Sequence, residues 1–98
     1  MPQKGKKIPY GSKLPIYFSE EELHLIRERT FVDPDFGRLA VAERGKLRLE
    51  LSLDDIEEVQ GYIAAEANHT NNKKVQRELD QIYEKLQRFL DNYDDQEE

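Results

Sequence analysis

The sequence predicts an α+β fold in which two or three short antiparallel strands pack with three helices, the last two forming a long antiparallel helical hairpin. Three observations lead to this prediction. Two segments, 14–26 and 47–59, each alternate apolar and polar residues up to a serine that acidic residues follow. A third segment, 73–93, carries apolar residues at alternating steps of four and three. Only the polar stretch 68–72 precedes it, and a connection this short makes the last two helices antiparallel neighbours.

The first two segments form a near-repeat that aligns Ser19 with Ser52. The alternation before each serine is that of a strand with one buried face. Each serine stands at an N-cap position, and the acids after it meet the positive end of the helix dipole. The match is in pattern more than in identity. It fits either two copies of one strand-to-helix unit or the sequence rules that all helix starts share.

The first predicted strand covers residues 14–18. Pro15 restricts this strand to the edge of a sheet, because proline cannot donate to a ladder of hydrogen bonds. A short helix then begins after Ser19, whose spacing to Glu22 is that of a capping box. The segment 32–37 is rich in turn residues and ends this helix.

Residues 38–51 predict a β-hairpin around Gly45, which supplies the positive φ that a tight turn needs. The alternative keeps only the second arm, 46–51, as a strand and leaves the first arm irregular. Ser52 then caps a second helix that runs to about Asn68.

The third helix has the apolar spacing of a coiled coil, but its apolar face is wider than a coiled-coil seam. A wide face is typical of a helix that packs on a globular core, and self-association is the alternative. We expect this face to include a surface for a protein partner or for a second copy in a homodimer. Its candidate residues are Leu79, Ile82, Tyr83, Leu86, Phe89, Leu90 and Tyr93.

Composition indicates one small domain between two tails. The 98 residues are 37% apolar and 37% charged, which leaves room for one modest core. Residues 1–13 combine lysines with proline and glycine and predict a flexible basic tail. Residues 94–98 predict an acidic disordered tail, so the domain is expected over residues 14–93.

No motif indicates catalysis, a cofactor or a metal. The chain contains no cysteine, and no Gly-x-Ser-x-Gly motif surrounds any of its serines. Glu66 and His69 have the helical spacing of a di-iron ligand pair, but such a site needs a second pair and two further glutamates. We therefore expect a protein that is not an enzyme and holds neither a cofactor nor a metal.

The expected function is a protein-interaction or regulatory accessory module that uses the helical hairpin. No apolar run reaches the ~20 residues of a membrane span, and no signal-peptide core is present, so we expect a cytoplasmic protein without membrane contact. The alternative is nucleic-acid association through the basic tail and the 71–77 tip, against which the net charge of −6 argues. Its candidate contacts are Lys4, Lys6, Lys7, Lys13, Lys73, Lys74 and Arg77.

Overall fold

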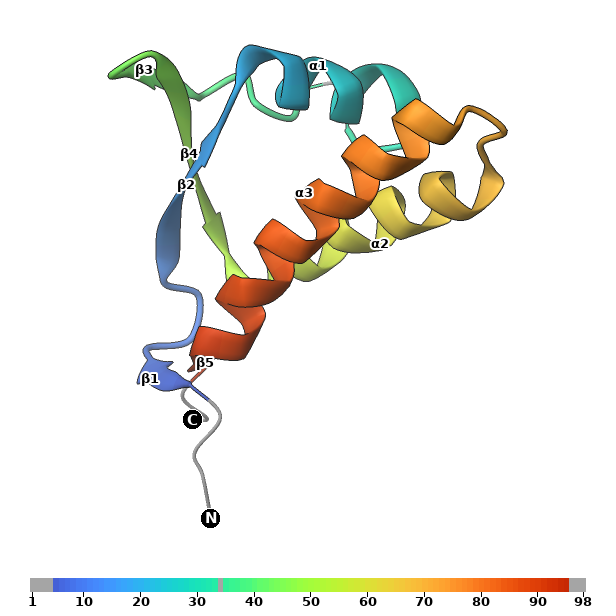
Figure 1. Ribbon diagram of the computed structural model, residues 1–98. Coiled ribbons are helices and arrows are strands. Elements are labelled where there is room, and N and C mark those ends of the chain that lie inside the picture. The colour runs from blue at the N-terminus through green and yellow to red at the C-terminus, as the bar shows by residue number, and fades with distance from the viewer. Residues whose placement is uncertain (1–4, 34, 96–98) are drawn as a thin grey trace.

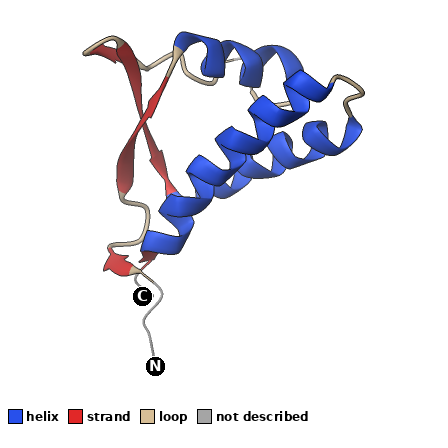
Figure 2. Ribbon diagram, viewed as in Figure 1, coloured by secondary structure: helices blue, strands red, loops and turns tan. Residues whose placement is uncertain are grey.

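The computed structural model describes residues 5–33 and 35–95 and has an α+β architecture in which all three helices lie on one side of a small sheet (Figures 1 and 2). In chain order the elements are β1 (Lys6–Ile8), β2 (Lys13–Phe18), α1 (Glu20–Arg29), β3 (Val41–Glu43), β4 (Lys46–Ser52), α2 (Leu53–His69), α3 (Lys73–Asn92) and β5 (Tyr93–Asp95). The predicted fold class is confirmed, and α2 and α3 pack closely together as the predicted hairpin.

The main sheet is antiparallel and has the strand order β2-β4-β3. Its register pairs Ile16 with Leu49, the two residues that the near-repeat also aligns with each other. The pairing is therefore symmetric about this pair, so that β2 leads into α1 at one end of the sheet and β4 leads into α2 at the other (Figure 1).

Both predicted helix starts are confirmed as complete capping boxes. The Ser19 hydroxyl accepts from the Glu22 N–H at 3.0 Å, and the Glu22 carboxylate accepts from the Ser19 N–H at 2.9 Å. Ser52 and Asp55 exchange the same two bonds at 3.1 and 3.0 Å. Because each box satisfies two otherwise unpaired amide groups, both strand-to-helix junctions are fixed by local sequence.

The position of Pro15 agrees with its missing N–H. It lies on β2, an edge strand, and pairs with Glu50 of β4. Lys46 and Glu43 close a two-residue turn at Arg44 and Gly45, which both have positive φ, and such a closing pair exchanges hydrogen bonds. By the alternation of an antiparallel ladder, Glu50 then points its main-chain groups away from β2, so β4 has no need of a donor at Pro15.

One hydrophobic core lies between the main sheet and the helices. The inward faces of β2 and β4 meet the apolar faces of α2 and α3, as the predicted alternation requires. The largest fully buried side chains are Phe18, Ile16, Ile26, Ile56, Ile63, Leu79, Ile82 and Leu86. The predicted hairpin at 38–51 is present in a shorter form, because its first arm begins only at Val41.

The two chain ends meet in a second, two-stranded sheet that the sequence does not predict. Strand β1 pairs in parallel with β5, and Ile8 of β1, which stands opposite Asp95, is buried. At Gly5, where φ is +75°, an added Cβ would lie 2.5 Å from the main-chain carbon of Asn92, so the approach requires glycine. Parts of the predicted tails at 1–13 and 94–98 thus belong to a sheet, whereas residues 1–4 and 96–98 lie outside the described residues.

Candidate functional site

Strand β4 has an open edge beside β3. The two strands pair only from Val41–Arg48 to Glu43–Lys46. Before Val41 the chain turns away, with the Ala40 N–H donating to the Gly37 carbonyl at 3.0 Å. If β3 continued in register, Leu39 would stand opposite Glu50, but the turn prevents this pairing. In the part of the chain that the structure describes, no strand covers this edge of Glu50.

A cavity of about 480 Å³ lies along this edge. Four consecutive residues of β4, from Arg48 to Leu51, line it together. Neighbouring strand residues point to opposite faces of a sheet, so a cavity touched by all four lies at the strand edge rather than over one face. Val32 and Phe36 of the α1–β3 segment and Val59 of α2 form its apolar inner wall.

Two large apolar side chains at this edge, Leu39 and Val41, are exposed to solvent, and a third, Phe31, is exposed in the segment that leads to it. The exposed fractions are 88% for Phe31, 84% for Leu39 and 50% for Val41. Leu39 and Val41 line the cavity themselves, and Phe31 precedes its wall residue Val32. We call Leu39, Val41 and the cavity along β4 the edge surface. Exposed apolar side chains beside a cavity with an apolar wall are a feature of surfaces that bind another molecule.

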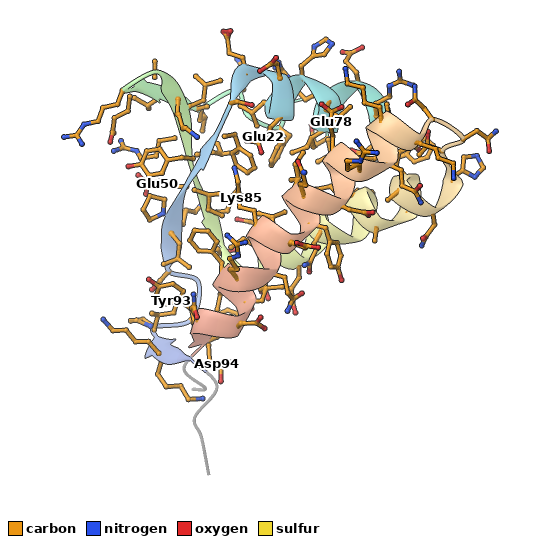
Figure 3. The ribbon with its side chains drawn as sticks, in the orientation of Figure 1. Glu22, Glu50, Glu78, Lys85, Tyr93 and Asp94 are labelled. Atoms are coloured by element: carbon orange, nitrogen blue, oxygen red, sulfur yellow. The ribbon has the colours of Figure 1, made fainter. Side chains whose placement is uncertain are left out.

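The charge of the edge surface is acidic. Its carboxylates are Asp33, Asp35, Glu50, Asp55 and Glu58, and its cations are Lys13 and Arg48. Arg48 is already engaged, since its guanidinium lies 2.7 Å from the Glu43 carboxylate and 3.9 Å from that of Glu50. Glu50 lies on the side of the sheet away from the helices (Figure 3). The surface therefore favours a basic ligand over an acidic one.

Lys85 of α3 forms a separate polar cluster on the helix side of the sheet (Figure 3). Its ammonium group donates to the Tyr17 carbonyl at 2.6 Å and to the Glu22 carboxylate at 2.9 Å, and it lies 4.9 Å from the centre of the Phe18 ring. These contacts join α3 to the junction between β2 and α1. Because its donors face protein acceptors, the cluster has a structural role.

The residues of the predicted helical interface fall into two groups. Leu79, Ile82 and Leu86 are at most 1% exposed and belong to the core, so they are not available to a partner. This corrects the predicted interface, because the wide apolar face of α3 is covered by α2 and the sheet of the same chain. The other members, Tyr83, Phe89, Leu90 and Tyr93, are half-buried and pack against that core.

The predicted nucleic-acid contacts lie at opposite ends of the molecule (Figure 1). Lys6, Lys7 and Lys13 belong to β1 and the start of β2, whereas Lys73, Lys74 and Arg77 open α3 at the far end. Lys7 also forms an ion pair with Asp94 at 2.9 Å. Lys4 lies outside the described residues. These residues do not form the single basic face that a duplex requires.

The described residues contain no group of three or more His, Cys, Asp or Glu side chains placed to hold a metal ion. Within the same residues no helix has the length and apolar character to cross a membrane.

The hydrogen bond from the Tyr10 hydroxyl to the Asp54 carboxylate, at 3.0 Å, raises the pKa of Tyr10, and the negative charge of Asp54 acts in the same direction. This tyrosine is exposed to solvent.

The edge surface was not predicted from the sequence. Its signal is a set of large apolar residues at 31–41 in a segment whose turn chemistry argues against burial.

Comparisons of the chain with protein-family models, with curated proteins and with solved structures found no match.

Proposed function

We propose that this protein is a non-catalytic protein-binding module and that the edge surface is its interface. The observation that carries the proposal is the exposure of Leu39 and Val41, which line a cavity at an unpaired strand edge. Fully burying one side chain of this size is worth roughly 1.5–3 kcal/mol. A partner that covers both would therefore gain part of the free energy that a specific complex needs.

This proposal keeps the expected function and moves the interface from the helical hairpin to the sheet edge. The central apolar residues of α3 are already buried within the chain, so a partner could reach them only if the hairpin opened. At the edge surface, by contrast, the apolar groups are already exposed. A preformed surface avoids the cost of ordering or unfolding a segment before binding.

The polar groups of the edge surface have roles in stability that need no catalytic explanation. The Asp55 carboxylate accepts from the Ser52 N–H in the capping box of α2, and the Asp33 carboxylate accepts from the Asp35 N–H at 2.8 Å. Arg48 holds Glu43 across the β3–β4 hairpin. The proposal includes a cytoplasmic location, which agrees with a chain that contains no cysteine.

Selection from a random twelve-residue peptide library tests the proposal. We expect peptides that bind the protein but lose at least tenfold in affinity for a Leu39→Ser, Val41→Ser double variant, because the variant removes exposed apolar area that a bound peptide would bury and leaves the charge unchanged. Both side chains are at least half exposed, so the variant retains its fold, which thermal melting verifies.

An Ala65→Ser, Gln81→Ser variant is the matched control, because it introduces the same side chain at two exposed positions on α2 and α3. The selected peptides should bind it as they bind the parent protein. Enrichment of no peptide over an albumin control contradicts the proposal. So does a set of peptides that the double variant binds with unchanged affinity.

A further inference from the structure

We propose that the edge surface binds its partner as an added β-strand: an extended segment of alternating basic and apolar residues pairs antiparallel with β4 at Glu50. This inference rests on the proposed function and specifies the chemistry of the partner. The added strand takes the place that β3 leaves when the chain turns away before Val41.

The main chain of Glu50 provides the first step. Lys46 and Arg48 direct their N–H and C=O groups to β3, and Glu50 has the same orientation because it lies an even number of residues further along the strand. The next such residue is Ser52, whose N–H is already taken by the Asp55 carboxylate. An incoming strand can therefore exchange one pair of main-chain hydrogen bonds with Glu50, as in recognition by strand addition.

The side chains of the partner follow from this pairing. In an antiparallel ladder, the residue directly opposite Glu50 points to the same face as Glu50. A lysine or arginine there would meet the Glu50 carboxylate, which is largely exposed. Its two neighbours point to the other face, where Val32, Phe36 and Val59 line the cavity. The partner segment is thus basic at alternate positions and apolar between them.

Charge favours such a segment over a second copy of this chain. Among the described residues, five carboxylates and two cations line the cavity, and one of the cations, Arg48, is held by Glu43 and Glu50. Two copies paired antiparallel at β4 would place these acidic groups against each other, with Glu50 facing Glu50. Like charges directly opposite in a ladder are destabilising, so self-association at this edge is disfavoured.

The probe is an eight-residue peptide of alternating lysine and valine, acetylated and amidated, titrated into ¹⁵N-labelled protein. We expect the amide signals of Glu50 and of its neighbours along the cavity to shift, with Glu50 moving downfield as it gains a hydrogen bond. The corresponding peptide of alternating glutamate and valine is the charge control, and its affinity should be at least tenfold lower.

Two N-methylated peptides test the strand geometry. When one lysine of the peptide stands opposite Glu50, the N–H groups of all its lysines point toward β4. The N–H groups of its valines then point away from β4, to solvent. N-methylation of every lysine should then lower affinity about tenfold or more, whereas N-methylation of every valine should leave it within about twofold. The two variants have the same mass and charge, so only the direction of the blocked amide differs.

Each outcome bears on one proposal. Equal loss with both methylated peptides, loss with neither, or loss confined to the valine set overturns antiparallel strand addition at Glu50. Equal binding of the glutamate peptide overturns the basic character assigned to the partner. A sedimentation result in which the protein alone dimerises and Glu50→Lys disrupts the dimer overturns the proposal in favour of self-association. A lysine–valine peptide that fails to bind, while selected peptides still bind at Leu39 and Val41, overturns the strand mode and leaves the proposed function intact.

Discussion

Replacing Leu86 with alanine should lower the free energy of unfolding by roughly 2–5 kcal/mol. Leu86 lies on α3 and is 0% exposed, in the core between this helix, α2 and the sheet. The substitution removes three carbon atoms from a packed site and leaves a cavity that the surrounding helices cannot fill without moving. Urea denaturation, with the slope of the transition compared between variants, measures the change.

Leu90→Ala is the matched control on the same helix. Leu90 is only partly buried, at the margin of the core, so the same chemical change should cost less. An unchanged transition midpoint for Leu86→Ala would show that the helical hairpin is not the centre of the core. Equal losses of unfolding free energy for the two variants would contradict the difference in burial between Leu86 and Leu90.

Replacing Phe18 with alanine should cost roughly 3–5 kcal/mol. Phe18 is 0% exposed at the end of β2, and its ring meets that of Phe36 edge to face, with 6.4 Å between the centroids. The Lys85 ammonium group lies over the Phe18 ring, 4.9 Å from the ring centre. The substitution thus removes an aromatic pair and a cation–π contact together with buried apolar area.

Phe18 also links the core to the edge surface through its contact with Phe36. Phe36 lines the cavity and is only partly buried, so its contact with Phe18 helps to hold the wall in place. Phe18→Leu, the matched variant, keeps most of the apolar volume and should lose less stability. Calorimetric melting of both variants measures the difference. If Phe18→Ala melts as the parent does, the packing described for the β2–α1 junction is incorrect.

The sequence predicts the strand-to-helix units well because their determinants are local. Ser19 and Ser52 each bond to the residue three positions ahead, so spacing alone identifies the helix starts. The alternation before each serine places one face inward, and the position of Pro15 on an edge strand follows from its missing donor. In the same way, steps of four and three in α3 identify the buried Leu79 and Leu86.

The features that the sequence does not predict depend on contacts between distant residues. Pairing of β1 with β5 joins main-chain groups about 87 positions apart, and composition contains no information on such pairs. The edge surface depends on where β3 begins. That start is set by the turn at Gly37 and Ala40, which shortens the strand and exposes Leu39. The alternating pattern predicts Leu39 and Val41 on one arm of a hairpin, but it does not predict how many residues of that arm pair with β4.

Amide hydrogen exchange at β4 tests the open edge most directly. The N–H groups of Leu49 and Leu51 point toward β2, opposite Ile16 and Leu14, and should exchange slowly in the free protein. The N–H of Glu50 points away from β2 and should exchange fast, at a rate close to that of an unfolded chain. It should become protected when the lysine–valine peptide binds. Slow exchange of the Glu50 amide in the free, monomeric protein would show that this edge is already paired, and would contradict the account.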